Sequence, residues 1–286
     1  MKKILIIALL LIFLVGCSKP EVSNGTVPGT NKGVGFVPSS DFKQSLTDAD
    51  SSGSYVGFYT PLDVNKDIPE LVKVAYEYKM NSIPIVNINF FNAATGQKMP
   101  GYTEESYKRQ ILNIVSKYKP KYIGIGNEIN RYDYIDEFVP VYNDLYKEIK
   151  KISPETSVFT VFQYEDLNDL SIISKFDVDA VGITTYPFLK GYKSPKEIPS
   201  GYYSRLSGLS KPMMFTEIGW HSSASEDEQV EFLNIFYQET AKANIKPEIT
   251  IWGLLYDVPS KGSMWNSGLF TKEGVKKKIF YEWTKG

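Results

Sequence analysis

The chain has 286 residues, with 32 lysine and arginine residues against 33 aspartate and glutamate residues and a formal net charge of −1. This balance, without a long basic run, argues against nucleic acid as the main partner. The only cysteine is Cys17 and the only histidine is His221, which excludes an internal disulfide and a Cys/His metal cluster. We therefore expect no metal and no cofactor, and chemistry from carboxylates, hydroxyls, amides and aromatic rings.

The N-terminus carries the pattern of a secretion signal. Lys2 and Lys3 precede the apolar run 4–15, which at about a dozen residues suits a signal peptide and is short for a membrane span. The run ends in Leu-Val-Gly-Cys, residues 14–17, which resembles the lipobox of bacterial lipoproteins. That resemblance implies cleavage before Cys17 and lipidation of its thiol. The alternative is a plain secretory signal with an incidental cysteine.

The next segment, residues 18–32, is polar and contains glycine, proline, serine and asparagine, which is typical of a flexible tether. We divide the chain into a signal peptide, residues 1–16, a lipidated cysteine with its tether, residues 17–32, and a catalytic domain, residues 33–286. Acyl chains on Cys17 would anchor the protein to a membrane without a spanning helix. This predicts a monomer in the bacterial cell envelope, outside the cytoplasm.

Eight short apolar runs follow the tether, and their nearly continuous apolar character is typical of strands that are buried on both faces. They are residues 33–38, 55–59, 83–90, 121–127, 157–163, 179–186, 212–218 and 249–255.

Helical patterns lie between these runs. Apolar stripes predict helices that open near Asp67, over 107–118 and over 138–149, and Ser225 to Glu228 has the pattern of a capping box that opens a fourth. A last helix is expected near 272–284, whereas the short polar connection 39–54 carries the weakest helix signal.

The alternation of strand and helix predicts an α/β fold with a parallel sheet, and eight units predict a single closed (β/α)8 TIM barrel. The alternative is an open doubly wound sheet. That fold usually carries a glycine-rich phosphate turn after its first strand, and this sequence has none there.

Two of the predicted strands end in a glutamate. Glu128 follows the run 121–127 directly, and Glu217 lies next to the end of the run 212–218. Active sites of such barrels lie at the carboxyl ends of the strands, so both carboxyl groups should reach the same opening. Two carboxyl groups roughly 5 to 5.5 Å apart can cleave a glycosidic bond with retention of configuration.

Asn127-Glu128 after the fourth strand and Thr-Glu-Ile-Gly-Trp, residues 216–220, at the seventh resemble the large clan of retaining glycoside hydrolases with (β/α)8 barrels. Endo-β-1,4-galactanases, β-glucanases and β-mannanases belong to this clan, and the second motif is also similar to the nucleophile segment of plant-type endo-β-1,3-glucanases. The resemblance covers residues 33–286. It implies an endo-acting hydrolase of β-linked poly- or oligosaccharides, with Glu128 as general acid/base and Glu217 as nucleophile.

The same resemblance implies contacts to the substrate. Asn127 would hydrogen-bond the sugar 2-hydroxyl, Tyr186 at the end of the sixth strand would contact the nucleophile, and Trp252 in the eighth would form an aromatic platform beneath the sugar. We add Trp220, which is expected to line the cleft, and Asn89 or Asn87, one of which is expected to replace a sugar contact.

The sequence also departs from the clan. Many members carry an arginine near the end of the second strand and a histidine near the end of the third, where this chain has Tyr-Thr-Pro, residues 59–61, and Asn-Ile-Asn, residues 87–89. Without the arginine, the nucleophile has less charge support. A catalytically silent barrel that acts as a surface glycan-binding lipoprotein is therefore the alternative function. A Schiff-base aldolase would need a lysine at a strand end, and none of the eight runs ends in one.

Overall fold

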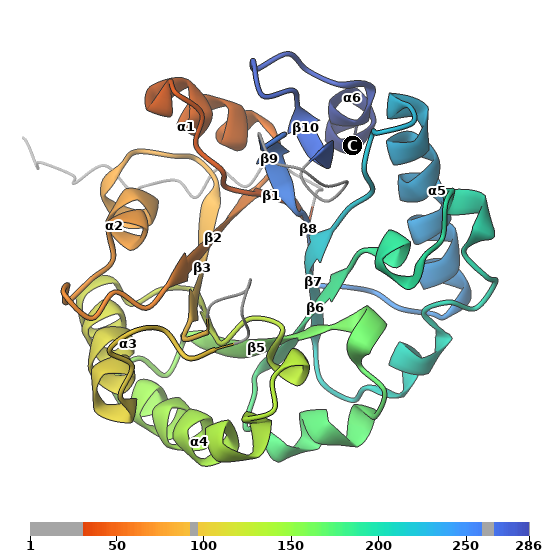
Figure 1. Ribbon diagram of the computed structural model, residues 1–286. Coiled ribbons are helices and arrows are strands. Elements are labelled where there is room, and N and C mark those ends of the chain that lie inside the picture. Colours follow the sequence, from red (N-terminus) through yellow and green to blue (C-terminus); the bar gives the residue numbers. More distant parts are fainter. Residues whose placement is uncertain (1–30, 92–96, 259–265, 286) are drawn as a thin grey trace, which may run out of the picture.

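The structure is a computed structural model that describes residues 31–91, 97–258 and 266–285. Eight parallel strands close into a barrel in the order of the chain, because β8 pairs with β1. Figure 1 shows the strands around the centre and the helices in an outer ring. The predicted TIM barrel is confirmed. The strands are β1 (Lys32–Gly35), β2 (Tyr55–Pro61), β3 (Ile83–Asn89), β4 (Tyr122–Ile125), β5 (Ser157–Gln163), β6 (Ala180–Thr185), β7 (Met213–Ile218) and β8 (Ile249–Trp252).

Six α-helices cover the described part of the barrel: α1 (Phe42–Ser51), α2 (Glu70–Glu77), α3 (Glu104–Tyr118), α4 (Ile135–Ile152), α5 (Glu226–Lys242) and α6 (Lys278–Thr284). The connections after β5 and β6, all of whose residues are described, hold 3-10 turns in place of α-helices. These turns are η2 (Tyr164–Asp166), η3 (Leu170–Lys175), η4 (Pro187–Lys190), η5 (Pro195–Glu197) and η6 (Ser204–Gly208). No helix of the described chain is long and apolar enough to cross a membrane.

Two helix starts differ from the sequence prediction. Ser225 is the N-cap of α5, as predicted, but its side chain accepts no capping hydrogen bond, so the predicted capping box is wrong. A complete box instead opens α3, where Thr103 and Ser106 bond each other's backbone N–H groups. The last helix begins at Lys278 rather than near 272. Residues 271–275 instead form a turn, after which Lys276 bridges back to Phe270 of a short strand, β10 (Gly268–Phe270).

Two hydrophobic cores lie on the two faces of the barrel wall. The interior core consists of Tyr55, Ile85, Phe159, Val161, Ala180, Met214, Ile249 and Ile251. A larger core fills the space between the strands and the outer helices. Since successive side chains of a strand point to opposite faces, membership of the interior core identifies which residues of each strand face inward.

The predicted strand 249–255 is broken at Gly253 into β8 and a separate strand, β9 (Leu254–Tyr256), which pairs with β10. The Gly253 N–H donates to the carbonyl of Ile218 at 2.9 Å. A Cβ at this position would lie 2.0 Å from the Tyr186 hydroxyl oxygen and 3.1 Å from the ring carbon that carries it. The break therefore depends on glycine, and it brings β9 out of the barrel wall.

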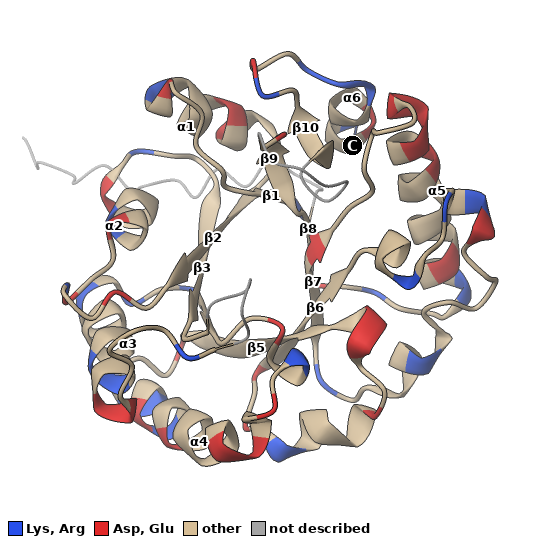
Figure 2. Ribbon diagram, in the orientation of Figure 1, with Lys and Arg blue, Asp and Glu red and all other residues tan. Residues whose placement is uncertain are grey.

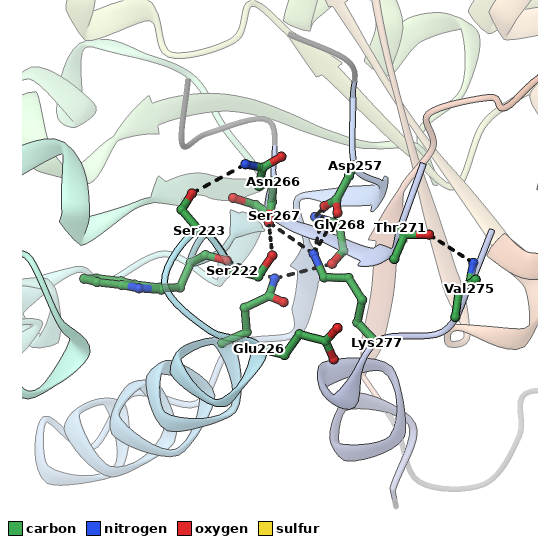
Figure 3. Close-up of polar contacts among 12 residues, drawn as sticks. Ser222, Ser223, Glu226, Asp257, Asn266, Ser267, Gly268, Thr271, Val275 and Lys277 are labelled. Carbon is green, nitrogen blue, oxygen red and sulfur yellow. Dashed lines mark hydrogen bonds and ion pairs between the residues drawn. The ribbon is translucent and has the colours of Figure 1, made fainter. Parts of the chain in front are cut away.

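A buried polar group, which we call the Lys277 cluster, joins β9, β10 and α6 (Figure 3). The Lys277 ammonium contacts both carboxylate oxygens of Asp257, at 2.8 and 3.0 Å, and the carbonyl of Asn266 at 3.1 Å. Asp257 also accepts the N–H of Gly268 at 2.8 Å, and the Asn266 carbonyl accepts from Ser222. The lysine side chain is only 2% exposed, and all of its charge is paired.

Candidate active site

Glu128 lies at the barrel mouth, the opening formed by the carboxyl ends of β1 to β8, on a tight turn after β4. Gly126 has a φ of 82° and Glu128 a φ of 51°, a left-handed conformation that residues with a side chain adopt at a cost on the order of 1–3 kcal/mol. The Glu128 carbonyl accepts the N–H of Arg131 at 3.1 Å, which closes the turn η1 (Ile129–Arg131). Such backbone strain clusters at functional sites.

Both carboxylate oxygens of Glu128 are engaged. Oε1 accepts the hydroxyl of Thr184, on β6, at 2.8 Å, and Oε2 pairs with the Arg131 guanidinium at 2.7 Å. The Glu128 side chain is 12% exposed and that of Arg131 is 38% exposed. The Arg131 guanidinium also lies 3.6 Å from Asp166. Glu128 is thus held from the barrel side by a hydroxyl and from the solvent side by a partly exposed cation, and Oε2 is available to a substrate once this ion pair opens.

Glu217 turns into the mouth because β7 is irregular. The register of β6 against β7 shifts at Thr184, whose partner is Glu217, while Thr216 is passed over. A bulge of this kind reverses the alternation of side chains for the residues that follow. Ile218 consequently lies in the outer core, and the Glu217 carboxylate faces the groups of the mouth.

Tyr186, directly after β6, holds Glu217. Its hydroxyl donates to Glu217 Oε2 at 2.8 Å, and the side chain is fully buried. The ring fits against two glycines, because a Cβ at Gly219 would come 2.8 Å from it and one at Gly253 would meet the hydroxyl. Burial and the charge of Glu217 raise the pKa of Tyr186 well above its usual range. The phenol therefore stays protonated and remains a hydrogen-bond donor.

The pKa of Glu217 indicates that the two glutamates lie close together. Burial, followed by the charge of Glu128, raises the pKa of Glu217 well above the ordinary carboxyl range, and hydrogen bonds from Tyr186 and Asn127 lower it. Such a shift at a carboxyl in a cleft, with a second carboxyl as one of its causes, is typical of acid–base sites. Without a ligand, the surroundings favour a proton on Glu217.

Three predicted asparagines lie along β3 and after β4. Asn127 bonds Glu217 and accepts the side-chain amide of Asn87 at 3.2 Å, and Asn87 is 1% exposed. Asn89, two residues further along β3, is partly exposed and accepts the N–H of Phe91 at 3.2 Å. Asn87 and Asn127 therefore form an amide network beside Glu217, whereas Asn89 orders the start of the loop that follows β3.

Trp252 lies outside the mouth. Its neighbour Ile251 belongs to the interior core, so alternation along β8 directs Trp252 to the outer face. The indole N–H donates to the Ser267 carbonyl at 2.6 Å, the ring lies 5.8 Å from that of Trp283 in α6, and the side chain is fully buried. The predicted sugar platform is contradicted, because Trp252 fastens the barrel wall to the outer helices.

Trp220 is also directed away from the mouth. It is fully buried, and its ring stacks with Phe232 of α5 at 5.8 Å between centroids. Its carbonyl accepts the Gln229 side-chain amide at 3.0 Å. The predicted cleft-lining role does not fit this position, because α5 covers the ring.

Tyr59 stands where the resemblance leads one to expect an arginine. It belongs to the strand face of Tyr55, an interior-core residue, and its hydroxyl donates to the Thr216 carbonyl. Burial and the charge of Glu217 raise the pKa of Tyr59, so the ring is near the predicted nucleophile and carries no charge of its own. Among the described residues, Arg131 is the arginine that lies at the mouth, and it pairs with Glu128 rather than with Glu217.

Sequence reasoning missed three residues of the site: Arg131, Thr184 and Glu165. Thr184 could have been found by counting two residues back from Tyr186 along an alternating strand. Arg131, three residues after Glu128, needed recognition of a 3-10 turn. Glu165 lies in η2, two residues after the end of β5, and no sequence pattern marked it.

No group of three or more His, Cys, Asp and Glu side chains in the described residues could hold a metal ion. Figure 2 shows charged residues mainly on the outer helices and connections, with the strands largely free of them. Cys17 and most of the tether lie outside the described residues, so lipidation stays a prediction.

Solved structures similar to this one are glycoside hydrolases. A family 39 glycoside hydrolase from Bacteroides cellulosilyticus WH2 aligns over 89% of this chain with a TM-score of 0.63 and 14% identity. An exo-β-1,4-mannosidase from Opitutaceae bacterium strain TAV5 aligns over 88% with a TM-score of 0.69 and 13% identity. A β-D-glucuronidase from Dictyoglomus thermophilum aligns over 88% with a TM-score of 0.62 and 15% identity.

The alignments cover 62%, 58% and 49% of these three neighbours, respectively. No protein-family model matches the chain, and no curated protein sequence matches it. At these identities the likeness establishes a barrel fold of the kind that glycoside hydrolases use, and function must be argued from the site.

Proposed function

We propose that the protein is a retaining glycoside hydrolase that cleaves β-glycosidic bonds, with Glu128 as general acid/base and Glu217 as nucleophile. The observation that carries this proposal is the pair itself. Two glutamates from β4 and β7 meet at the carboxyl end of one barrel, close enough for the charge of Glu128 to raise the pKa of Glu217. The glycosidase barrels among the structural neighbours support the same class of reaction.

The reaction would proceed in two displacements. In the first, the ionised Glu217 attacks the anomeric carbon, the bond to the leaving oxygen breaks, and Glu128 gives that oxygen its proton. In the second, Glu128 takes a proton from water, the water oxygen attacks the same carbon, and the ester to Glu217 breaks. The sugar leaves with its original configuration, and both carboxyl groups return to their starting states.

Neighbouring groups of the mouth have roles in this scheme. The Tyr186 hydroxyl and the Asn127 amide stabilise the Glu217 carboxylate and orient it. In the scheme, Asn127 transfers its donor to the sugar 2-hydroxyl once substrate is bound. Catalysis needs Glu217 ionised, whereas burial favours a proton on it, so substrate binding has to shift that proton away.

A poly- or oligosaccharide is the proposed substrate, and endo action follows from the resemblance to endo-galactanases and β-glucanases. Anchoring through Cys17, a place in the bacterial envelope and a monomeric state belong to the same proposal. The neighbours named above act on different sugars according to their names, so the barrel leaves the sugar open. The lengths of the products formed from a defined oligosaccharide test endo action.

A catalytically silent, glycan-binding barrel is the second candidate, and specific observations favour it. The cation of the mouth, Arg131, pairs with Glu128 rather than supporting Glu217. Tyr59 stands in place of the clan's arginine, and Trp252 is turned away from the mouth.

Single substitutions separate the two candidates. In the hydrolase, Glu217→Gln abolishes turnover of 4-nitrophenyl β-glycosides and leaves glycan binding intact, because the amide keeps the shape and cannot form the ester. Glu128→Ala retains a fast first step on such activated substrates and then accumulates the glycosyl ester. Added azide should restore its turnover and give a glycosyl azide of retained configuration.

Glu239→Gln is the matched control, since Glu239 is a buried glutamate on α5, outside the mouth. It should cleave like the wild type. Inverted product from the wild-type protein would refute the double displacement, and unaltered activity of Glu217→Gln would remove that residue from the site. Binding of glycans without cleavage of any would establish the silent barrel.

A further inference from the structure

Besides Glu128 and Glu217, a further carboxyl group lies buried beside the mouth, and it has no role in the two-glutamate scheme. Glu165 lies in η2, two residues after the end of β5, and is 3% exposed. Its Oε1 accepts three hydrogen bonds: from the Thr185 hydroxyl at 2.7 Å, from the Tyr186 backbone N–H at 3.1 Å and from the Tyr202 hydroxyl at 3.2 Å. Two of these donors are the last residue of β6 and the residue after it.

The other oxygen of Glu165 is buried and has no hydrogen-bond partner among the described residues. Burial raises the pKa of Glu165, and the hydrogen bonds to it act in the opposite direction. Leaving a buried carboxyl oxygen unpaired costs free energy. An apolar side chain would fill this space at a lower cost in free energy. The role of the carboxylate is therefore connected with the groups that donate hydrogen bonds to it.

The surroundings of Glu165 are rich in tyrosine and in hydrogen bonds. Tyr202 and Tyr203 come from the segment between β6 and β7, and Tyr203 contacts the Thr185 hydroxyl at 3.2 Å. Arg205 donates to the Tyr164 carbonyl and lies 4.1 Å from the centre of its ring. The groups around Oε1 therefore make hydrogen bonds and ring contacts of their own.

Tyr186 connects this carboxyl group with the predicted nucleophile. Its backbone N–H is bound by Glu165 at one end, and its hydroxyl binds Glu217 at the other. Between the two ends, the ring lies against Gly219 and Gly253, which leave no room for a Cβ. A shift of the Tyr186 backbone is thus passed on to its hydroxyl, because the intervening ring has little room to adjust.

We propose that Glu165 is a positioning residue: by holding the Tyr186 backbone, it fixes the point at which the Tyr186 hydroxyl meets Glu217. It touches no reacting atom. The catalytic consequence rests on the proposed function, whereas the positioning of Tyr186 against Glu217 can be measured without any turnover.

The direct test is a titration of Glu217 by carbon-13 NMR on protein labelled at the glutamate carboxyl carbons. The Glu217 signal is identified by its loss in Glu217→Gln. The hydrogen bond from Tyr186 lowers the pKa of Glu217, so its loss should move the titration to higher pH. Glu165→Ala should show this upward shift and match Tyr186→Phe in size.

The double variant Glu165→Ala/Tyr186→Phe should shift no further than either single variant, since both act on one hydrogen bond. Glu165→Gln should titrate like the wild type, because the amide keeps an oxygen acceptor for the N–H. The other titratable groups facing Glu217 are Glu128 and Tyr59, and they are the same in all of these variants.

Glu239→Ala is the matched control, because Glu239 is also buried and accepts the N–H of Gly201, in the same tyrosine-rich segment, without touching Tyr186. It should leave the Glu217 titration unchanged. Should Glu165→Ala not fold, Glu165→Met fills a similar volume without an acceptor and gives the same comparison. An unshifted Glu217 titration in the folded Glu165→Ala or Glu165→Met variant overturns the proposal.

Activity gives a second readout. On an aryl β-glycoside that the wild type cleaves, Glu165→Ala should lower kcat at least tenfold with KM nearly unchanged, and Glu165→Gln should stay within twofold of the wild type. An equal loss in Glu165→Ala and Glu239→Ala would reveal a merely structural effect and overturn the proposal. If the wild type cleaves no glycoside, the proposed function fails while the titration still decides the positioning role.

Discussion

Two parts of this barrel bury charged groups, and they treat them in opposite ways. In the Lys277 cluster, the ammonium has three oxygen partners from two residues, and the carboxylate of Asp257 also accepts a backbone N–H. In the mouth, burial and the charge of a second carboxyl group raise the pKa of Glu217, Glu128 has a left-handed backbone, and one oxygen of Glu165 is unpaired.

The difference separates a scaffold from a site. Where the chain only has to fasten β9 and β10 to α6, every charge finds an opposite charge or a hydrogen bond. Where chemistry is proposed, groups are held in states that cost free energy, and the rest of the barrel compensates for that cost. The four predictions below test this contrast by comparing what each part contributes to stability.

The largest expected effect is in the Lys277 cluster. Lys277→Met should destabilise the protein by about 3 kcal/mol, because it leaves the Asp257 carboxylate, which is 17% exposed, without its counter-charge. Urea unfolding of the wild type, of this variant and of a control variant measures the loss of stability. The control is Lys278→Met, whose ion pair with Asp227 is exposed, so its loss should change the stability far less than the loss of Lys277 does. Equal effects of the two substitutions would show that the cluster contributes nothing special.

Trp252→Phe should cost about 2 kcal/mol, because it removes volume from the outer core and leaves the Ser267 carbonyl unpaired. Catalysis per folded molecule should stay unchanged if the ring faces the helices. Thermal unfolding and steady-state kinetics on the same preparation separate the two quantities. A large loss of kcat at unchanged stability would instead indicate that Trp252 contacts the substrate.

Glu217→Gln should stabilise the protein, and the gain should grow with pH. The folded-state pKa of Glu217 is raised, so the unfolded chain loses its proton first and wild-type stability falls as pH rises through the neutral range. Below the ordinary carboxyl pKa of about 4, the two proteins should be equally stable. Near pH 8 the variant should gain at least about 1 kcal/mol in urea unfolding.

The control with the opposite sign is Glu239→Gln. Burial alone would raise the pKa of Glu239, but the hydrogen bonds from Lys242 and the Gly201 N–H outweigh it and lower the pKa. This substitution should therefore lower stability at neutral pH and have little effect in acid. A gain in stability in both variants would mean that Glu217 is held in no more unfavourable a state than Glu239 on α5.

The smallest expected effect is at Arg131. Its ion pair with Glu128 is partly exposed, so Arg131→Ala should change the free energy of unfolding by less than about 1 kcal/mol. With alkyl glycosides, which depend on proton donation, kcat should rise by up to about fivefold, since no ion pair has to open first. Aryl glycosides should be cleaved at the wild-type rate. A fall in kcat would instead show that Arg131 orients Glu128.

The barrel and its two glutamates could be predicted because they depend on local signals. Buried parallel strands are apolar throughout, and Glu128 and Glu217 break that pattern where strands end. Side-chain direction could be predicted only where a strand is regular. Applied to β8, alternation would have excluded Trp252 from the mouth, whereas on β7 it would have wrongly excluded Glu217, because nothing in the sequence marks the bulge at Thr216.

The residues that support the site were harder to predict, since they depend on contacts between distant segments. Arg131 reaches Glu128 only because the chain makes a 3-10 turn after β4. Glu165 reaches Tyr186 only because the connections after β5 and β6 are turns that pack tyrosines around it. Neither arrangement follows from helix or strand periodicity, so the regular pattern that predicts the barrel could not have revealed them.

The direction of β1 has a consequence for how the molecule would sit in an envelope. The chain enters β1 at Lys32, at the amino ends of the parallel strands, whereas Glu128 and Glu217 lie at their carboxyl ends. The same lysine bonds the carbonyls of Trp283 and Lys285, so both ends of the described barrel meet on that side. If the proposed lipid on Cys17 anchors the chain, the tether joins the barrel on the side opposite the mouth. The attachment to the membrane then does not stand between the mouth and a polymer that approaches it.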